Sequence, residues 1–145
     1  KGRARRGPTF GEALLVHAVA RLALHPWITN VQASWVKLGP DGVRQALSSG
    51  VNDLGGTLMN ESISRAAGSE WGQELPPDEM EALIRSAGRV PWQRTTTYGV
   101  PPDERVRASF VAPPLAESLN PPVRDAGLKA PPRLVRPAAL AVRAR

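Results

Sequence analysis

The sequence predicts an α/β fold: an incomplete C-terminal sector of a (β/α) TIM-type barrel, followed by a disordered tail rich in Pro, Ala and Arg. Three observations favour this fold. Several segments carry apolar residues at helical spacing, and alternating or β-branched segments lie between them. Nine of the fifteen prolines lie at or after Pro101. Strands separated by helices imply right-handed crossovers and therefore a parallel sheet.

The first two elements are a helix and a strand. Thr9 and Glu12 have the spacing of a capping box, and the apolar pattern that follows continues to His25-Pro26, where a helix must end. Residues 28–36 (ITNVQASWV) alternate with a period of two, which is typical of a strand. The sequence therefore predicts a helix over residues 10–24 and a strand over residues 28–36.

A second helix and strand follow in the same order. Pro40-Asp41 is a good opening for a short helix, and Gly50 is a good end for it. Residues 51–54 (VNDL) form a brief predicted strand that closes at Gly55-Gly56. Asn60 then caps a predicted helix that stops at Gly68.

The last predicted elements precede the prolines. Asp78 and Glu81 resemble a second capping box, for a helix that ends at Gly88. Residues 93–99 (QRTTTYG) are rich in β-branched residues and predict a third strand. From Pro101 onward the paired prolines oppose both helices and central strands, so no regular structure is expected there.

This pattern divides the chain into a basic lead-in over residues 1–8, the barrel sector over residues 9–100 and a tail over residues 101–145. Three parallel strands with two free edges are unusual for an independent domain. A whole barrel takes about 250 residues, roughly twice what this chain supplies. Because the chain also begins at Lys1 rather than Met, we expect it to be a piece of a longer barrel.

Composition restricts the possible functions. The net charge of +6 comes from the two ends, because residues 11–104 hold more acidic than basic residues; this argues against a nucleic-acid-binding domain. No stretch has the length and hydrophobicity of a membrane span or a signal peptide, so a cytoplasmic protein is expected. The chain has no cysteine, which excludes a disulfide framework and a cysteine-ligated metal centre built from this chain alone.

In a barrel, ligands bind at the carboxyl ends of the strands. Alternation places the side chains of the first strand on two faces, with one polar pair toward the barrel interior. The glycines after the second strand allow the backbone to approach a ligand closely. Residues 94–98 run along the last predicted strand and border the same end of the barrel, called the mouth below. The candidate binding residues at this mouth are Gln32, Ser34, Trp35, Lys37, Asn52, Asp53, Gly55, Gly56, Thr57 and Glu61.

Each candidate also has a structural explanation. Trp35 can be a core anchor rather than a stacking platform, and Lys37 can simply extend into solvent. Asn52 and Asp53 can satisfy loop amides. Glu61 is favoured in the first turn of a helix by the helix dipole without any ligand. His17 and His25 are not clustered with other ligands, and no metal site is predicted.

Three stretches of the chain resemble a known family: RRGPTFGEALLVHAVARLALHPWITNVQASWVKLGP, GVNDLGGTLMNESISRAAG and MEALIRSAGRVPWQRTTTYG. Over residues 5–99 they are similar to the C-terminal part of FO synthase, a radical S-adenosylmethionine (SAM) enzyme of coenzyme F420 biosynthesis. Shorter versions of two motifs also occur in related menaquinone-pathway enzymes that act on futalosine derivatives. These relatives are an alternative within the enzyme class.

The resemblance implies a barrel in which a 4Fe-4S cluster cleaves SAM to a radical. It implies tyrosine and 5-amino-6-(D-ribitylamino)uracil as substrates. A hydroxybenzyl group derived from tyrosine would be joined to the uracil on the way to the deazaflavin. At the matching positions, Gln32, Asn52 and Asp53 would bond ribityl or ribose hydroxyls. Gly55 and Gly56 would let the backbone approach the ligand.

The chain departs from the family in one respect. The family holds its cluster with a C-x-x-x-C-x-x-C motif, and this chain has no cysteine. We therefore expect a fragment that is not competent alone and needs the remainder of the barrel, as upstream sequence or a partner chain. A second class stays open: a non-catalytic basic binding module whose termini contact anionic partners.

Overall fold

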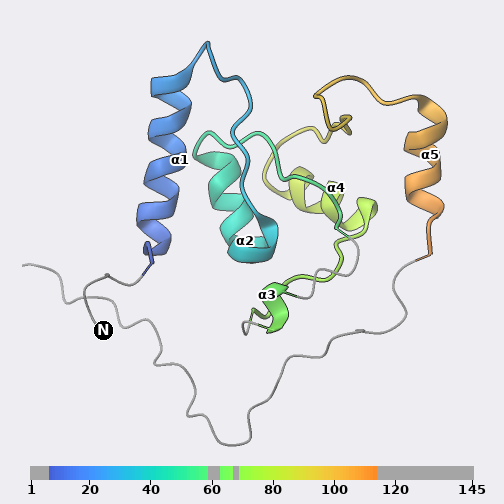
Figure 1. The fold of residues 1–145 in the computed structure, drawn as a ribbon, viewed down its shortest axis with the longest axis horizontal. Coiled ribbons are helices and arrows are strands. Elements are labelled where there is room, and N and C mark those ends of the chain that lie inside the picture. Colours follow the sequence, from blue (N-terminus) through green and yellow to red (C-terminus); the bar gives the residue numbers. More distant parts are fainter. Residues whose placement is uncertain (1–6, 59–62, 67–68, 114–145) are drawn as a thin grey trace, which may run out of the picture.

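The computed structural model describes residues 7–58, 63–66 and 69–113 (Figure 1). Within these ranges the chain forms five helices, in the order α1, α2, α3, α4 and α5. The predicted cap at Asn60, the candidate site residue Glu61, most of the basic lead-in and residues 114–145 of the predicted tail lie outside the described residues.

Helix α1 (Phe10–Leu24) confirms the first predicted element at both ends. The Thr9 hydroxyl accepts a hydrogen bond from the Glu12 amide at 3.2 Å, and the Glu12 carboxylate accepts one from the Thr9 amide at 2.8 Å. His25 has left the helical conformation, because the residue before a proline is disfavoured in it. The local signals at both ends were sufficient to locate this helix.

The predicted strand over residues 28–36 is wrong in its length. In the part of the chain that the structure describes, there is one parallel bridge, between Gln32 and Asp53, and helix α2 (Trp35–Ser48) begins where the strand was expected to continue. The Ser34 carbonyl accepts hydrogen bonds from the amides of residues 37 and 38, which closes a helical turn. Trp35 and Lys37 therefore lie on this turn, and not at the end of a strand.

Helix α2 contains a kink at Gly39, where φ is +66°. The part after the kink is the helix predicted from Pro40-Asp41. Its predicted end at Gly50 is confirmed, because Gly50 has a φ of +105°, a left-handed conformation that glycine adopts without a Cβ penalty.

Helices α3 (Ile63–Ala66) and α4 (Pro77–Ser86) follow. The predicted capping box at Asp78 and Glu81 is wrong, because α4 begins earlier. Pro77 takes the first helical position, where its missing N–H has no partner to lose, and no side chain caps the helix. The predicted end of this helix at Gly88 is confirmed by its φ of +69°.

The third predicted strand, over residues 93–99, is not formed. The Thr95 hydroxyl accepts the Gly99 amide at 2.9 Å, the Thr95 carbonyl accepts the Tyr98 amide at 3.1 Å, and Tyr98 has a φ of +62°. These local bonds make a turn, which competes with an extended ladder. Helix α5 (Asp103–Val111) is also contrary to expectation, since the segment after Pro101 was predicted to lack regular structure.

The predicted α/β sheet therefore needs correction: over the described ranges, strand pairing consists of the one bridge, and the regular structure is helical. Helix α2 packs between α1 and α4, and α4 contacts α5 (Figure 1). A parallel sheet requires further paired strands on each side, and over the described residues the two segments pair only at this bridge. None of the described helices is long and apolar enough to cross a membrane.

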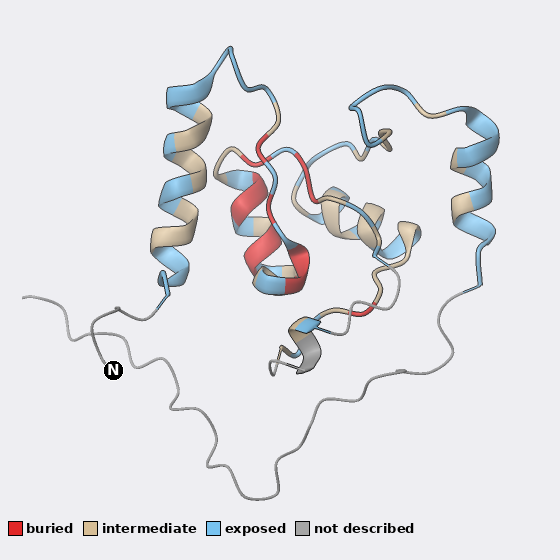
Figure 2. Cartoon of the chain, in the orientation of Figure 1, coloured by how far each residue is buried: buried red, intermediate tan, exposed pale blue. Residues whose placement is uncertain are grey.

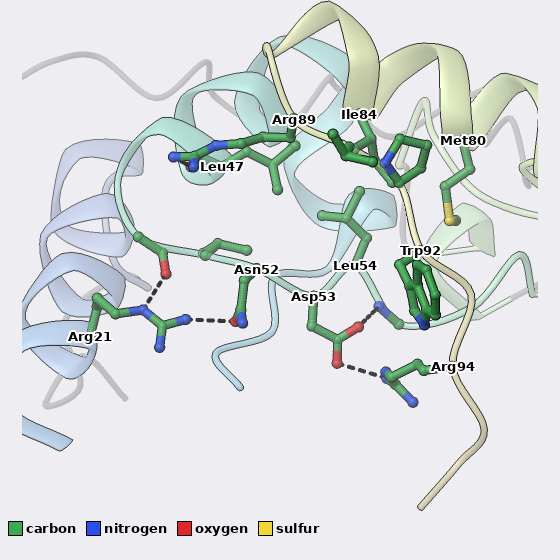
Figure 3. A pocket seen from close by; sticks show the side chains of 15 residues that line it. Arg21, Leu47, Asn52, Asp53, Leu54, Met80, Ile84, Arg89, Trp92 and Arg94 are labelled. Atoms are coloured by element: carbon green, nitrogen blue, oxygen red, sulfur yellow. Dashed lines mark hydrogen bonds and ion pairs between the residues drawn. The ribbon is translucent and has the colours of Figure 1, made fainter. Parts of the chain in front are cut away.

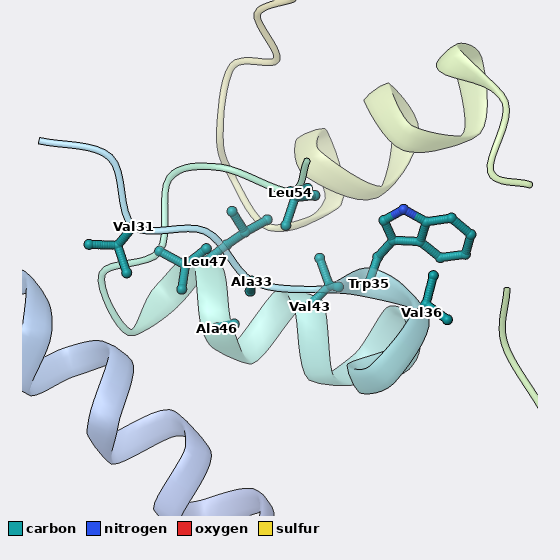
Figure 4. Packing of buried hydrophobic residues seen from close by; sticks show 9 residues of the cluster. Val31, Ala33, Trp35, Val36, Val43, Ala46, Leu47 and Leu54 are labelled. Carbon is teal, nitrogen blue, oxygen red and sulfur yellow. The ribbon is translucent and has the colours of Figure 1, made fainter. Parts of the chain in front are cut away.

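The core lies between the bridged segments and helix α2 (Figures 2 and 4). Figure 2 shows buried residues concentrated on α2 and the two chain segments beside it, while α1 and α5 have no buried residue. This places the core directly behind the bridge. Its members are Val31, Ala33, Trp35, Val36, Val43, Ala46, Leu47, Val51 and Leu54.

Candidate functional site

The first of the two bridged segments presents one buried face and one exposed face. The amide of Ala33 donates to the Asp53 carbonyl at 2.9 Å, which holds the segments side by side. Val31 and Ala33 are buried in the core, and Gln32 and Ser34 between and after them are exposed. The predicted alternation is thus confirmed. The polar pair Gln32 and Ser34 is on the exposed side of this segment.

The turn after the second segment lies against the first. Gly55 has a φ of +79°, and a Cβ placed on it would collide with the side-chain amide of Gln32. The carbonyl of Gly56 accepts a hydrogen bond from the indole N–H of Trp35 at 3.0 Å. Trp35 is 6% exposed, so it is a core anchor that also holds this turn in place.

The Asp53 side chain accepts three hydrogen bonds and lies beside the larger pocket (Figure 3). Its side chain is 6% exposed. One carboxylate oxygen, Oδ1, accepts the Gly55 amide at 2.9 Å, and the other, Oδ2, accepts Arg94 Nη2 at 2.7 Å and the Tyr98 hydroxyl at 3.2 Å. A buried carboxylate is stable when it is paired and hydrogen-bonded in this way.

Arg94 completes the cluster. Its guanidinium carbon lies 4.3 Å from the centroid of the Tyr98 ring, a cation–π arrangement, and Nη1 donates to the Thr95 carbonyl at 3.0 Å. The hydrogen bond to Asp53 raises the pKa of Arg94 above its ordinary value, against an opposing effect of desolvation. Its Nε is buried and has no hydrogen-bond partner, although the side chain as a whole is 26% exposed.

Sequence reasoning placed Arg94 and Tyr98 near the mouth but did not include them among the candidate residues. The available signal was Gly99 together with the Thr hydroxyls of residues 95–97, because Gly favours turns and Thr hydroxyls can form local hydrogen bonds to the backbone. A turn brings Tyr98 back toward Asp53, which a straight strand would not do.

The Asn52 side chain links the bridged segments to helix α1. Its Oδ1 accepts hydrogen bonds from Arg21 Nη2 at 2.6 Å and from the Val31 amide at 2.9 Å, and its Nδ2 donates to the Thr29 carbonyl at 3.1 Å. Arg21 also donates to the carbonyls of Thr29 and Gly50. Asn52 thus satisfies loop groups, the structural alternative given for it above.

The remaining described candidates, Ser34, Lys37 and Thr57, lie around the Asp53 cluster and are not part of it. The hydroxyl of Ser34 makes no capping bond to helix α2, and Lys37 is exposed one turn further along. Thr57 is held by its carbonyl, which accepts the Leu75 amide at 2.9 Å. The structure therefore brings together Gln32, Trp35, Asp53, Gly55 and Gly56, with Arg94 and Tyr98 added. It leaves Ser34, Lys37 and Thr57 around that group.

Two pockets adjoin the cluster. The larger, of about 520 Å³, lies between residues 50–55 and the segment 89–94 (Figure 3). The smaller, of about 260 Å³, lies between the Gly55–Thr57 turn, helix α4 and Ser109 of α5. Gly55, Trp92 and Arg94 line both pockets. A movement of Arg94 would therefore change the shape of both.

The residues present do not fit an iron-sulfur cluster. The chain contains no cysteine. Over residues 7–58, 63–66 and 69–113, no group of three or more His, Asp or Glu side chains could hold a metal ion. The chemistry of this site is hydrogen bonding from amide, hydroxyl, guanidinium and backbone groups.

Comparisons with known proteins agree with the resemblance. The family described as the CofH/MqnC C-terminal region matches residues 3–106. The chain is 53% identical over 108 residues to an FO synthase of Streptomyces coelicolor, covering 74% of this chain and 12% of that protein. Two proteins are named 5-amino-6-(D-ribitylamino)uracil--L-tyrosine 4-hydroxyphenyl transferase. The one from Methanopyrus kandleri is 54% identical over 98 residues, which cover 68% of this chain and 27% of that protein. The one from Synechococcus elongatus is 54% identical over 94 residues, which cover 65% of this chain and 24% of that protein.

No solved structure matches the chain. The chain spans between 12% and 27% of the length of the three curated relatives described. The family match covers well over half of the chain, including both bridged segments and the Asp53, Arg94 and Tyr98 cluster. The chain belongs to the CofH/MqnC C-terminal region family.

Proposed function

We propose that this chain forms part of the substrate-binding wall of a radical SAM enzyme. That enzyme joins a tyrosine-derived hydroxybenzyl group to 5-amino-6-(D-ribitylamino)uracil in deazaflavin biosynthesis. Relatives whose names carry these two substrates are 50–54% identical to most of the chain, and this observation carries the proposal. The cluster and SAM would be held by the remainder of the barrel, because the residues of this chain do not fit a cluster.

Gln32 is the direct ligand-binding residue in this proposal. Its side-chain amide is exposed and adjoins Gly55, and no hydrogen bond to it is formed within the described part of the chain. An amide offers both donors and an acceptor, which suits a ribityl chain or a pyrimidine edge. Gly55 and Gly56 would let the ligand approach the backbone, and Ser34, Lys37 and Thr57 would border it.

Asn52 and Asp53 stay proposed site residues with a condition. Their side-chain atoms already bind partners within the chain, so a substrate hydroxyl would have to share those acceptors. Trp35, which is buried, would support the Gly56 carbonyl rather than stack on the substrate. Glu61, outside the described residues, is proposed only from its matching position.

The remainder of the barrel is the proposed partner of this chain. The first bridged segment exposes its polar residues Gln32 and Ser34, and the next strand of a barrel would pair beside the bridged segments. Helix α1 also exposes apolar residues on the side away from α2. Both features suit a sector that is completed by further strands and helices.

The test uses the complete enzyme, containing this chain and the cluster-binding part, with the cluster reconstituted. Gln32→Ala should raise the KM for the uracil substrate about tenfold, the size of losing one good hydrogen bond to a bound ligand. Gln45→Ala is the matched control, because Gln45 is exposed on α2 away from the bridge. Product would be measured by mass spectrometry. Unchanged KM and turnover in Gln32→Ala would contradict the proposed role.

An alternative activity is favoured by one observation: the matched family description includes MqnC as well as CofH. The chain would then belong to a menaquinone-pathway enzyme acting on a futalosine derivative. Assaying the same complete enzyme with each substrate distinguishes the two. Turnover of the futalosine derivative, and none of the uracil with tyrosine, would replace the first proposal with this one.

A further inference from the structure

We propose that Asp53, Arg94 and Tyr98 form a positioning unit that holds the Gly55-Gly56 turn against Gln32. In this role the three residues set substrate affinity through the turn and Gln32, whether or not Asp53 also shares an acceptor with a substrate hydroxyl. The inference rests on the proposed function, because it concerns the same site. It assigns roles to Arg94 and Tyr98, two residues that lie far from Asp53 in the sequence.

The geometry supplies the connection. Asp53 Oδ1 accepts the Gly55 amide at 2.9 Å, so the carboxylate holds the turn directly. Asp53 Oδ2 accepts Arg94 Nη2 at 2.7 Å and the Tyr98 hydroxyl at 3.2 Å. Arg94 and Tyr98 therefore hold the carboxylate through Oδ2, and the carboxylate holds the turn through Oδ1. Loss of a donor would therefore weaken the hold of the carboxylate on Gly55, and loss of the charged Arg94 donor would weaken it most.

The Gly55 backbone makes the position of the turn matter. Gly55 has no Cβ, and its close approach to the Gln32 amide leaves no room for one. A small shift of the turn would therefore move the Gln32 side chain, the group proposed to bind substrate. The Trp35 indole holds Gly56 from the core side, so the turn is fixed at two neighbouring residues by groups from two directions.

Three features of the unit reduce the stability of the fold and would be unfavourable if the unit had only a structural role. A carboxylate is buried, the buried Arg94 Nε has no hydrogen-bond partner, and Tyr98 has a φ of +62°, in a region that bulky residues rarely occupy. An unsatisfied buried donor and a strained backbone each destabilise the folded state. Such costs concentrate at functional sites, where local rules are broken for the sake of geometry. A purely structural cluster would be better served by apolar packing.

The test measures kinetics and hydrogen exchange on the complete, reconstituted enzyme. The variants are Asp53→Asn, Arg94→Gln, Tyr98→Phe and the double variant Asp53→Asn with Arg94→Gln. Arg44→Gln is the control, because Arg44 makes an exposed ion pair with Asp41 on α2. Asp53→Asn and Arg94→Gln should each raise the KM for the uracil substrate about tenfold with kcat changed less than about twofold, a loss of ground-state binding.

Two further results are expected. Amide exchange of peptides spanning residues 51–58 should accelerate in these variants and stay unchanged in the control. The double variant should be no worse than the more impaired single variant, because residues of one unit are not additive. Tyr98→Phe keeps the ring over Arg94 and loses only one hydrogen bond, so its effect on KM should be smaller than that of Arg94→Gln.

Several outcomes would overturn the inference. These are unchanged exchange over residues 51–58, additive losses in the double variant, or a fall in kcat at unchanged KM, which would mean that a residue contacts the reacting atoms. If Asp53→Asn lowers the melting temperature of the enzyme, Arg94→Lys and Tyr98→Phe provide the same comparison with a milder change. If the unmodified enzyme does not convert the uracil substrate, the proposed function fails, while the exchange measurement still decides whether the unit holds the turn.

Discussion

At the scale of single residues, the site contains two adjacent glycines, Gly55 and Gly56, that have different surroundings. Gly55 adopts a left-handed conformation and lies against the Gln32 amide, whereas a Cβ on Gly56 would meet nothing within 4 Å. The adjacent glycines therefore differ in what they tolerate, although the sequence presents them as an equivalent pair. Only the first is required by the backbone conformation.

Gly55→Ala should destabilise the chain by about 1–3 kcal/mol, because the new Cβ is strained in the left-handed region and displaces Gln32. Gly56→Ala is the matched control and should change stability by less than about 0.5 kcal/mol, as is usual for substitutions away from tight contacts. Urea unfolding followed by circular dichroism measures both. Equal stability of the two variants would mean that the approach of Gly55 to Gln32 is not required.

The candidate site could be predicted in part. Alternation correctly separated the buried Val31 and Ala33 from the exposed Gln32 and Ser34, because a side-chain period of two follows from extended backbone geometry alone. The partnership of Asp53 with Arg94 and Tyr98 could not be predicted. It depends on a turn that returns the chain across more than 40 residues of sequence separation. No local pattern encodes such a contact.

At the scale of elements, helices were easier to predict than strands. Helix α1 has both of its end signals within the sequence, at Thr9 with Glu12 and at His25-Pro26. A strand needs a partner, so residues 28–36 and 93–99 could not be settled by their own composition. Helix α5 had a usable signal that was outweighed by the prolines: Asp103 and Glu104 follow Pro102 and occupy a first helical turn.

Arg21 joins helix α1 to the site, and its loss should undock that helix. It donates to the Gly50 carbonyl at 2.7 Å, the Thr29 carbonyl at 2.8 Å and Asn52 Oδ1 at 2.6 Å. Arg21→Gln should cost about 2 kcal/mol, because it leaves acceptors without partners, and should accelerate amide exchange in α1. Arg44→Gln should change neither. Unaltered exchange in α1 would mean that apolar packing alone holds the helix.

At the scale of the whole molecule, the described chain buries a small core and exposes a large apolar surface. On α1, Leu15, Val19 and Leu22 recur at helical spacing and are 62%, 53% and 82% exposed. Exposed apolar stripes of this kind mark surfaces that another segment covers. Because the chain spans between 12% and 27% of its curated relatives, the remainder of the barrel is the proposed cover.

The isolated chain should therefore bind a hydrophobic dye such as ANS and increase the fluorescence of the dye. Adding the cluster-binding part of the enzyme should reduce this fluorescence. It should also raise the melting temperature of the chain, because a partner that binds the folded state stabilises it. Val19→Glu with Leu22→Glu should prevent this rise by placing charges on the stripe. Val111→Glu is the control, because Val111, at 80%, is about as exposed as Leu22 but lies at the end of α5. If the stripe variant assembled as well as the control, α1 would face solvent in the complete enzyme. The remainder of the barrel would then have to contact the chain at the bridged segments alone.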